Sequence, residues 1–160
     1  MRLVLDTNVW LDWLVFEDPD VAPVKAAVHA GTATVCMNLA CEAELVRVLA
    51  YPRTHTTLDA AAQAERLAAC RRIARHVDDG PPARSPAAAL PRCRDADDQK
   101  FVELAWRCEA HALITRDRAL LDLARGTLRS IGCRIVTPQQ FAAGISAGTS
   151  PRAAAASADR

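Results

Sequence analysis

The residues of this sequence that could support chemistry are acids placed just beyond predicted strands. Asp6 directly follows a short apolar strand, and Asp117 lies just past another one, within Thr115-Arg116-Asp117. The carboxyl ends of parallel strands lie at one edge of a sheet, so these acids are expected to converge there. Further acids approach the same edge on two predicted helices: Glu42, Glu44, Asp95, Asp97 and Asp98.

A group of carboxylates of this kind favours a divalent cation. Carboxylates held roughly 3–6 Å apart repel one another and raise each other's pKa values unless a cation lies between them. Oxygen ligands select Mg²⁺ or Mn²⁺, and the lack of His and Cys ligand spacing argues against zinc. A metal bound in this way can deprotonate an attacking water and stabilise a phosphoryl transition state. The pattern therefore predicts metal-assisted hydrolysis of a phosphodiester.

Each acid also has a purely structural interpretation. An aspartate at a helix start is usually an N-cap or a partner of the helix dipole, and this applies best to the acids at 95–98. Asp6 is harder to explain in this way because it closes a buried strand. Glu42 and Glu44 would ordinarily be solvated, but their helix is apolar almost all round. Convergence at one sheet edge is what favours the functional interpretation.

Strands and helices alternate along the chain, which predicts an α/β fold. The pattern is typical of a mostly parallel sheet with helices on both faces, so we expect a three-layer α/β/α domain with four or five strands. This domain covers residues 1–143, and the Ala- and Ser-rich residues 144–160 are interpreted as a tail with little tertiary packing. The expected strands are 2–5, 34–37, 112–115 and 134–136. The expected helices are 9–16 (capped by Thr7 or Asn8), 19–29, 39–50 (capped by Asn38), 57–75, 95–108, 118–124 and 138–143. Residues 80–92 are expected to form a proline-rich loop.

The composition is that of an ordinary globular domain and disfavours several classes of protein. No apolar run reaches the ~18 residues that a membrane span needs, and no secretory signal is recognisable, so a cytoplasmic location without membrane association is expected. The six cysteines show no Cys-x-x-Cys spacing, so we expect reduced, mostly buried thiols. A net charge of +1 means that RNA would have to be bound by local clusters of basic residues. The absence of a glycine-rich phosphate loop disfavours a nucleotide-binding domain.

Four motifs occur in order between residue 2 and about residue 143. They are LDTNV at 5–9, AELVRVL at 43–49, RDADDQKF at 94–101 and LITRD at 113–117. Together they resemble the motifs of PIN domains, and more specifically of the bacterial PIN family assigned to the toxins of toxin–antitoxin systems.

This resemblance implies one particular set of metal-binding acids. The glutamate of the family directly precedes a leucine, which selects Glu44 over Glu42. The third acid of the family stands seven residues before a helix alanine, here Ala105, which selects Asp98 over Asp95. The implied metal ligands and catalytic residues are Asp6, Glu44, Asp98 and Asp117, with Asp95 as a further candidate.

Other residues near the motifs have expected supporting roles. Thr7, Asn8 and Thr115 are expected to orient carboxylates or waters by hydrogen bonding. Arg116 stands where the family more often has a small residue, and its side chain is expected either to crowd the site or to neutralise a substrate phosphate.

Two further groups of residues have competing interpretations. Trp10 and Trp13, at i and i+3 of a helix, favour packing in the core or in a dimer over stacking on bases. Arg71, Arg72 and Arg75 favour a solvated helix face over contact with RNA phosphates.

The resemblance thus implies a Mg²⁺- or Mn²⁺-dependent endoribonuclease, the toxin of a toxin–antitoxin pair. RNA is the expected substrate, a small antitoxin protein the expected partner, and a homodimer is compatible with the sequence. Two alternatives stay open. One is a non-catalytic PIN-like domain that binds RNA or protein. The other is a metal-dependent nuclease that acts on DNA, which the lack of an arch or a helix-hairpin-helix-like extension weakens.

Overall fold

A computed structural model describes residues 1–52, 57–78 and 90–148 of the chain, with side chains placed up to residue 144. Most of the predicted proline-rich loop (79–89) and most of the predicted tail (149–160) lie outside the described residues. In the described part of the chain, no helix is both long and apolar enough to span a bilayer.

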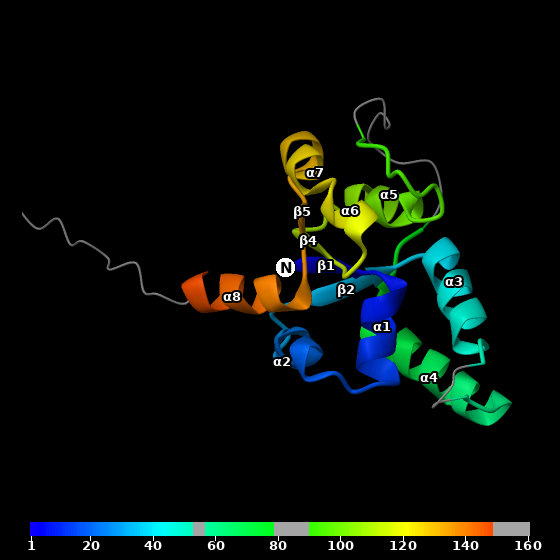
Figure 1. Cartoon of the computed structure of the whole chain (residues 1–160). Coiled ribbons are helices and arrows are strands. Elements are labelled where there is room, and N and C mark those ends of the chain that lie inside the picture. Colours follow the sequence, from blue (N-terminus) through cyan, green and yellow to red (C-terminus); the bar gives the residue numbers. More distant parts are fainter. Residues whose placement is uncertain (53–56, 79–89, 149–160) are drawn as a thin grey trace, which may run out of the picture.

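A five-stranded, fully parallel sheet forms the centre of the domain. The strand order is β3-β2-β1-β4-β5, and helices cover both faces of the sheet (Figure 1). The predicted three-layer α/β/α architecture is confirmed. The strands are β1 (Arg2–Leu5), β2 (Thr34–Met37), β3 (Ala74–His76), β4 (Ala112–Ile114) and β5 (Arg134–Val136).

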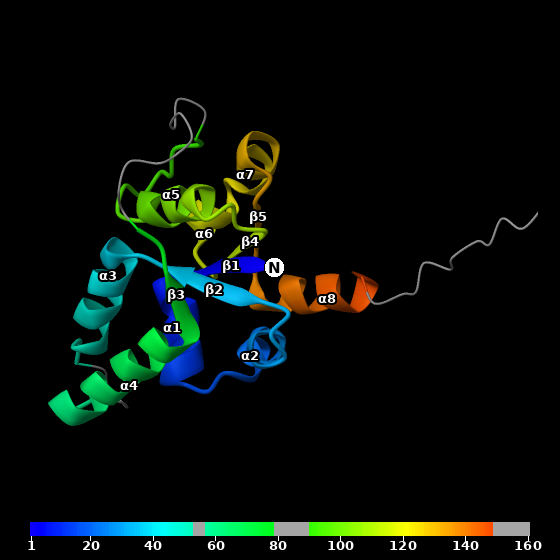
Figure 2. The same ribbon diagram turned by 180° about the vertical axis from the view of Figure 1, so that it is seen from behind.

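The edge strand β3 is absent from the sequence-based prediction, which extended a helix to about residue 75. The helix α4 (Ala60–Ile73) instead ends at Ile73, and Ala74 already has extended backbone angles. Ala74–His76 then pairs with β2, with Val35 opposite Ala74 (Figure 2). A partly exposed strand of only three residues shows too little alternation of apolar and polar side chains to be recognised from sequence.

The helices are divided between the two faces of the sheet (Figure 1). The helix α5 (Gln99–Arg107) packs on β1, β2 and β4, and it lies with α6 and α7 on one side of the sheet (Figure 1). The opposite side carries α1 and α2. The remaining bounds are α1 (Thr7–Leu14), η1 (Pro19–Val21), α2 (Ala22–His29), α3 (Leu39–Leu49), α6 (Arg118–Leu121), α7 (Ala124–Ile131) and α8 (Pro138–Gly148).

Two helices differ from the prediction near the C-terminal part of the domain. The expected helix 118–124 ends early, at Leu121, as α6, and it is followed by α7, a helix that was not predicted. Gly132 caps the end of α7 with φ +72°, a left-handed conformation that glycine tolerates without strain. The helix α8 runs to Gly148 and so passes the expected domain boundary at residue 143.

The core forms where the central strands are covered on both faces. Leu3, Val4 and Leu5 of β1 are at most 1% exposed, as expected for a central strand of a parallel sheet. Trp10 and Trp13 are buried beside them with ring centroids 5.7 Å apart, so the prediction that they pack in the core is confirmed. None of the six cysteines, all of which lie in the described part of the chain, forms a disulfide, and five of them are buried.

The path of the chain through the sheet fixes where a site can form. From β1 the chain builds β2 and β3 on one side, and then returns to the other side of β1 to build β4 and β5. The connections on the two sides of β1 therefore leave the sheet in opposite directions. In open α/β sheets such a switch point opens a crevice at the carboxyl ends of the two strands, here β1 and β4.

Candidate functional site

Asp6 lies at this switch point, immediately after β1. Its backbone N–H donates to the carbonyl of Ile114, at a distance of 3.1 Å, which ties it to the end of β4. Its Oδ1 atom accepts the N–H of Val9 at 2.9 Å, and its backbone is extended, so Asp6 is the N-cap of α1. The predicted caps Thr7 and Asn8 were wrong by one or two residues, because both already lie inside the helix.

Thr115 connects Asp6 to Asp117. The hydroxyl of Thr115 donates to Oδ2 of Asp6 and accepts the backbone N–H of Asp117 at 2.8 Å. Thr115 is fully buried, so this arrangement has little freedom to change. The contacts are those expected of a residue that orients the Asp6 carboxylate and fixes the backbone at Asp117.

Asp117 has a structural function as well as its place beside Asp6. Its Oδ1 atom accepts the N–H groups of Ala119 at 2.6 Å and Leu120 at 3.2 Å, and so caps the short helix α6. One oxygen of each carboxylate, on Asp6 and on Asp117, is thus committed to a helix N-terminus.

Burial of Asp6 has an electrostatic cost. The side chain is 2% exposed, and burial raises the pKa of this carboxyl above its usual range, although hydrogen bonds from Thr115 and from backbone N–H groups oppose the rise. A carboxylate that is buried without a neighbouring cation is unfavourable, and a bound cation would remove this penalty.

Asp98 stands at the start of α5 and is influenced by the other acids. Burial, followed by the negative charges of Asp117, Asp95 and Glu44, raises its pKa to about 6. Within the described residues its side chain makes no capping hydrogen bond to α5. Asp95 instead accepts the N–H of Asp97 at 2.9 Å. The structural interpretation of these acids therefore fits Asp95 and not Asp98.

Glu44 is held by a lysine. On α3, its Oε2 atom lies 2.5 Å from Nζ of Lys100, and the two side chains are 17% and 20% exposed. Lys100 also lowers the pKa of Asp98, against the effect of the acids. The helices α3 and α5, which carry this pair, lie side by side in both views of the molecule (Figures 1 and 2).

Glu42, left open by the sequence, belongs to a different cluster. Its Oε1 atom accepts Nε of Arg71 at 2.9 Å, and its Oε2 atom lies 2.8 Å from Nε2 of His76. The Arg71 guanidinium holds the pKa of Glu42 below its usual range. These contacts join α3 to α4 and β3, and they give both Glu42 and Arg71 a structural role.

Arg116 is engaged by three aspartates. Its Nε atom lies 2.8 Å from Asp12, and one of its terminal nitrogens lies 3.1 Å from Asp18 and 3.2 Å from Asp20. The amide of Gln139 also donates to Asp20. These ion pairs direct the guanidinium toward α1 and η1. The expectation that Arg116 crowds the site or neutralises a substrate phosphate has no support in this geometry and stays a prediction.

Thr7 and Asn8 complete the predicted group. The backbone N–H of Asn8 contributes to lowering the pKa of Asp6, which indicates a contact with that carboxylate. The hydroxyl oxygen of Thr7 is buried without a hydrogen-bond partner among the described residues. A buried, unpaired hydroxyl is suited to bind a water or a ligand.

The donor set fits a hard divalent cation, although the ligands are not gathered around one point. Among residues 1–52, 57–78 and 90–148, no three His, Cys, Asp or Glu side chains lie close enough to enclose a metal ion. The charges of Asp117, Asp95 and Glu44 nevertheless act on Asp98, and Thr115 links Asp6 to Asp117. All of these groups offer oxygen ligands, the kind that Mg²⁺ and Mn²⁺ prefer. The assignment of Asp6, Glu44, Asp98 and Asp117 as metal ligands stays a prediction.

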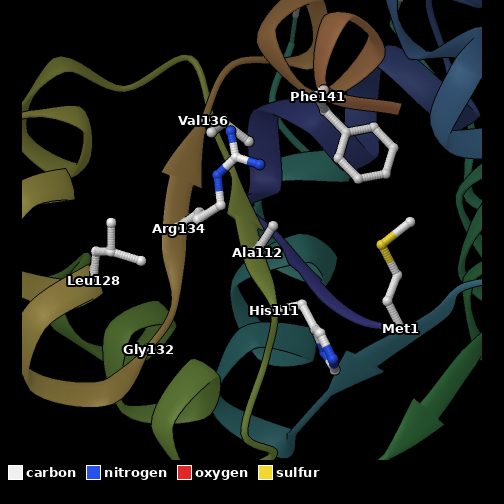
Figure 3. Close-up of a pocket in the computed structure, with 9 residues that line it drawn as sticks. Met1, His111, Ala112, Leu128, Gly132, Arg134, Val136 and Phe141 are labelled. Atoms are coloured by element: carbon white, nitrogen blue, oxygen red, sulfur yellow. The ribbon is translucent and has the colours of Figure 1, made fainter. Parts of the chain in front are cut away.

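Two cavities lie in different places relative to these acids. One, of about 400 Å³, is lined by residues interleaved with Asp95 and Asp98: Leu90, Arg92, Cys93, Ala96, Gln99 and Glu103. The other, of about 380 Å³, lies along the edge strand β5 between Leu128 and Phe141 (Figure 3). Met1, His111 and Gly132, which precede strands, help to line the second cavity, so it reaches the sheet edge opposite the acids.

Lys100 is the residue of this site that the sequence analysis missed. It lies inside the third motif, two positions after Asp98, where a lysine on a helix is ordinarily interpreted as a solvated side chain. The sequence did contain a signal, because only Lys25 and Lys100 among its 20 basic residues are lysines.

Comparison with known proteins gives a family for the chain. The family model described as PIN domain matches residues 2–119, which include all four motifs. Searches of curated proteins and of solved structures gave no significant match. PIN domains are generally nucleases with a nuclease-like fold, and they typically use divalent metals. Since the match covers well over half of the sequence, the chain belongs to the PIN domain family.

Proposed function

We propose that this chain is a metal-dependent endoribonuclease whose site is formed by Asp6, Glu44, Asp98 and Asp117. The observation that supports this most is the placement of Asp6, Thr115 and Asp117 at the β1/β4 switch point. The negative charges of neighbouring acids also raise the pKa of Asp98. A structural role alone does not explain Asp98, because its carboxylate is unfavourable where it stands and makes no cap.

The residues of the chain have separate tasks in this proposal. A bound Mg²⁺ or Mn²⁺ would supply an activated water and neutralise the charge of the phosphate. Thr115 fixes the direction of the Asp6 carboxylate, while the helix-capping bonds fix Asp117, so neither acid has to be ordered when the substrate binds. Asp98, at the start of α5, and Glu44, on α3, would supply the remaining ligands.

The finer assignments depend on the resemblance of the motifs. An RNA substrate, a toxin role, a small antitoxin partner and a cytoplasmic location are what that bacterial PIN family implies. The arrangement of acids supports phosphodiester hydrolysis and is neutral between RNA and DNA.

The decisive experiment measures cleavage of labelled single-stranded RNA and of matched DNA by the purified full-length chain. Cleavage of RNA with Mg²⁺ or Mn²⁺, its loss in EDTA, and its loss in Asp6→Asn would support the proposal. An Asp97→Asn variant is the matched control, because Asp97 is exposed and its backbone N–H rather than its side chain makes the local turn. Cleavage of DNA alone would overturn the assignment of substrate, and chelator-resistant cleavage would overturn the assignment of mechanism.

One observation favours a second candidate, a non-catalytic PIN-like domain that binds RNA or protein. Glu44, one of the four proposed ligands, is already paired with Lys100. If that pair persisted in excess Mn²⁺ and no cleavage occurred, this second function would replace the first.

A further inference from the structure

Lys100 occupies a position that a small cation would suit. Its ammonium lies 2.5 Å from Glu44 Oε2, a buried atom that makes no well-directed hydrogen bond to any described residue, so the contact is that of a point charge with a carboxylate. The same ammonium donates to the carbonyl of Asp97 and lies 5.0 Å from the ring centroid of the buried Phe101. Both contacts hold it at the N-terminal turn of α5.

The choice of a lysine here differs from the rest of the chain. Basic positions in this sequence are otherwise arginines, with Lys25 as the single exception. An ammonium is a compact charge that can be displaced by another cation, whereas a guanidinium forms a planar fork that favours a permanent bidentate pair. The guanidinium of Arg71 uses two nitrogens on one oxygen of Glu42, and that of Arg116 bridges three aspartates, so each is held by several contacts at once.

We propose that Lys100 is the resident cation of the acidic site, holding Glu44 in the metal-free protein and leaving it when a divalent cation binds. The inference rests on the proposed function, since it takes Glu44 as a metal ligand. It goes beyond that function because it defines the metal-free state of the site. In that state the Lys100 ammonium pairs with Glu44 and competes with the metal for this carboxylate.

Two consequences follow for metal binding. Removal of the ammonium makes the site more negative by one charge and frees Glu44, so a divalent cation should bind more tightly. At the effective dielectric constant of a partly exposed site, one charge a few ångströms away corresponds to at least about a tenfold change in Kd. The second consequence is that the Lys100 amine should become more accessible when the metal binds.

The first test titrates the full-length chain with Mn²⁺ and follows the heat of binding. Lys100→Met should lower the Kd for Mn²⁺ by about tenfold or more. Lys100→Arg keeps the charge but is harder to displace, so it should leave the Kd at the wild-type value or raise it. Lys25→Met is the control, because Lys25 lies near Trp13 on another helix and should leave the Kd unchanged. An unchanged or weaker affinity in Lys100→Met would overturn the inference.

The second test needs no substitution and so does not depend on the folding of a variant. The wild-type chain is acetylated with a limiting amount of a water-soluble acylating reagent, in EDTA or in excess Mg²⁺, and the two lysines are quantified by mass spectrometry. Mg²⁺ should raise the rate of acetylation of Lys100 severalfold and leave that of Lys25 unchanged. A Lys100 rate that does not rise, while the heat of binding shows that metal is bound, would overturn the inference.

Failure of the proposed function and failure of the inference about Lys100 would give different results. If neither Mn²⁺ nor Mg²⁺ binds wild type or Asp6→Asn with measurable heat, the proposed function fails. If wild type binds metal in an Asp6-dependent way but Lys100 neither competes nor becomes exposed, only the role of Lys100 fails.

Discussion

The charge of Asp98 should destabilise the metal-free protein, so its removal should stabilise the fold. In the sequence this acid looks like a helix cap, but within the described structure its side chain makes no capping bond. Burial and the neighbouring acids raise its pKa from 3.8 to about 6. This pKa already includes the attraction of Lys100, so the net effect of the surroundings on the charged form is unfavourable.

The size of the effect follows from the pKa. A rise from 3.8 to about 6 corresponds to roughly 3 kcal/mol of preference for the neutral form in a fully buried site. Asp98 is only partly buried, so solvent screening reduces this to about 1–2 kcal/mol. Asp98→Asn keeps the shape of the neutral acid and should therefore gain about 1–2 kcal/mol at pH 7.5, or about 3–6 °C in Tm for a domain of this size.

The dependence on pH gives an independent check. A carboxyl whose pKa is raised by folding binds its proton more tightly in the native state, so the native state loses stability as the pH rises from 3.8 through about 6. Wild type and Asp98→Asn should therefore have equal stability below about pH 4 and should diverge as the pH rises to 7.

Urea or thermal unfolding in EDTA at pH 4 and pH 7.5 measures this difference, with Asp97→Asn as control. Addition of Mg²⁺ should stabilise wild type more than Asp98→Asn, because a ligand that binds only the native state shifts the equilibrium by mass action. An Asp98→Asn variant that is clearly less stable in EDTA at pH 7.5 would refute the reasoning and assign Asp98 a structural role.

Three further predictions concern separate clusters. Asp6→Asn should lose at least about a hundredfold in RNA cleavage while staying folded, since the amide oxygen can still cap α1; a cleavage assay with circular dichroism checks both. Glu42→Gln should lower the Tm by roughly 2–5 °C at pH 7. Because folding lowers the pKa of Glu42, the stability that its charge contributes is present above about pH 4.5 and is lost as the pH falls, so the difference in Tm should shrink in acid. A difference in Tm that does not change with pH would argue against the Arg71 pair as its cause. Arg116→Met leaves three aspartates without their shared cation and should cost about 1 kcal/mol after allowance for its partial exposure, measured by urea unfolding against an exposed Arg118→Met control of equal stability to wild type.

The parts of the fold and site that could be predicted from sequence are those fixed by order along the chain. The residue after a parallel strand lies at the carboxyl edge of the sheet whatever the side chains do, so the placement of Asp6 and Asp117 near each other followed from the strand assignments alone. The short edge strand β3 could not be predicted, because its pairing with β2 depends on a partner distant in sequence. The ion pairs of Arg116 with three aspartates could not be predicted either, because the aspartates lie on other elements. For the same reason the sequence does not show that Glu42 pairs with Arg71 while Glu44 pairs with Lys100.

A structural role and a functional role do not exclude each other at Asp6 and Asp117. Asp6 caps α1 and Asp117 caps α6, and each acid uses one carboxylate oxygen for its helix. The other oxygen of each carboxylate remains at the switch point. Capping fixes the carboxylate in a direction set by the backbone, which is what a preorganised ligand requires. An alanine substitution at either position would remove cap and charge together and could not separate stability from chemistry. An asparagine substitution keeps the capping oxygen and removes the charge, although at Asp6 it also replaces the acceptor of the Thr115 hydroxyl by an NH2 group. Activity lost by Asp117→Asn, or by Asp6→Asn, without loss of stability therefore reports on the chemistry rather than on the cap.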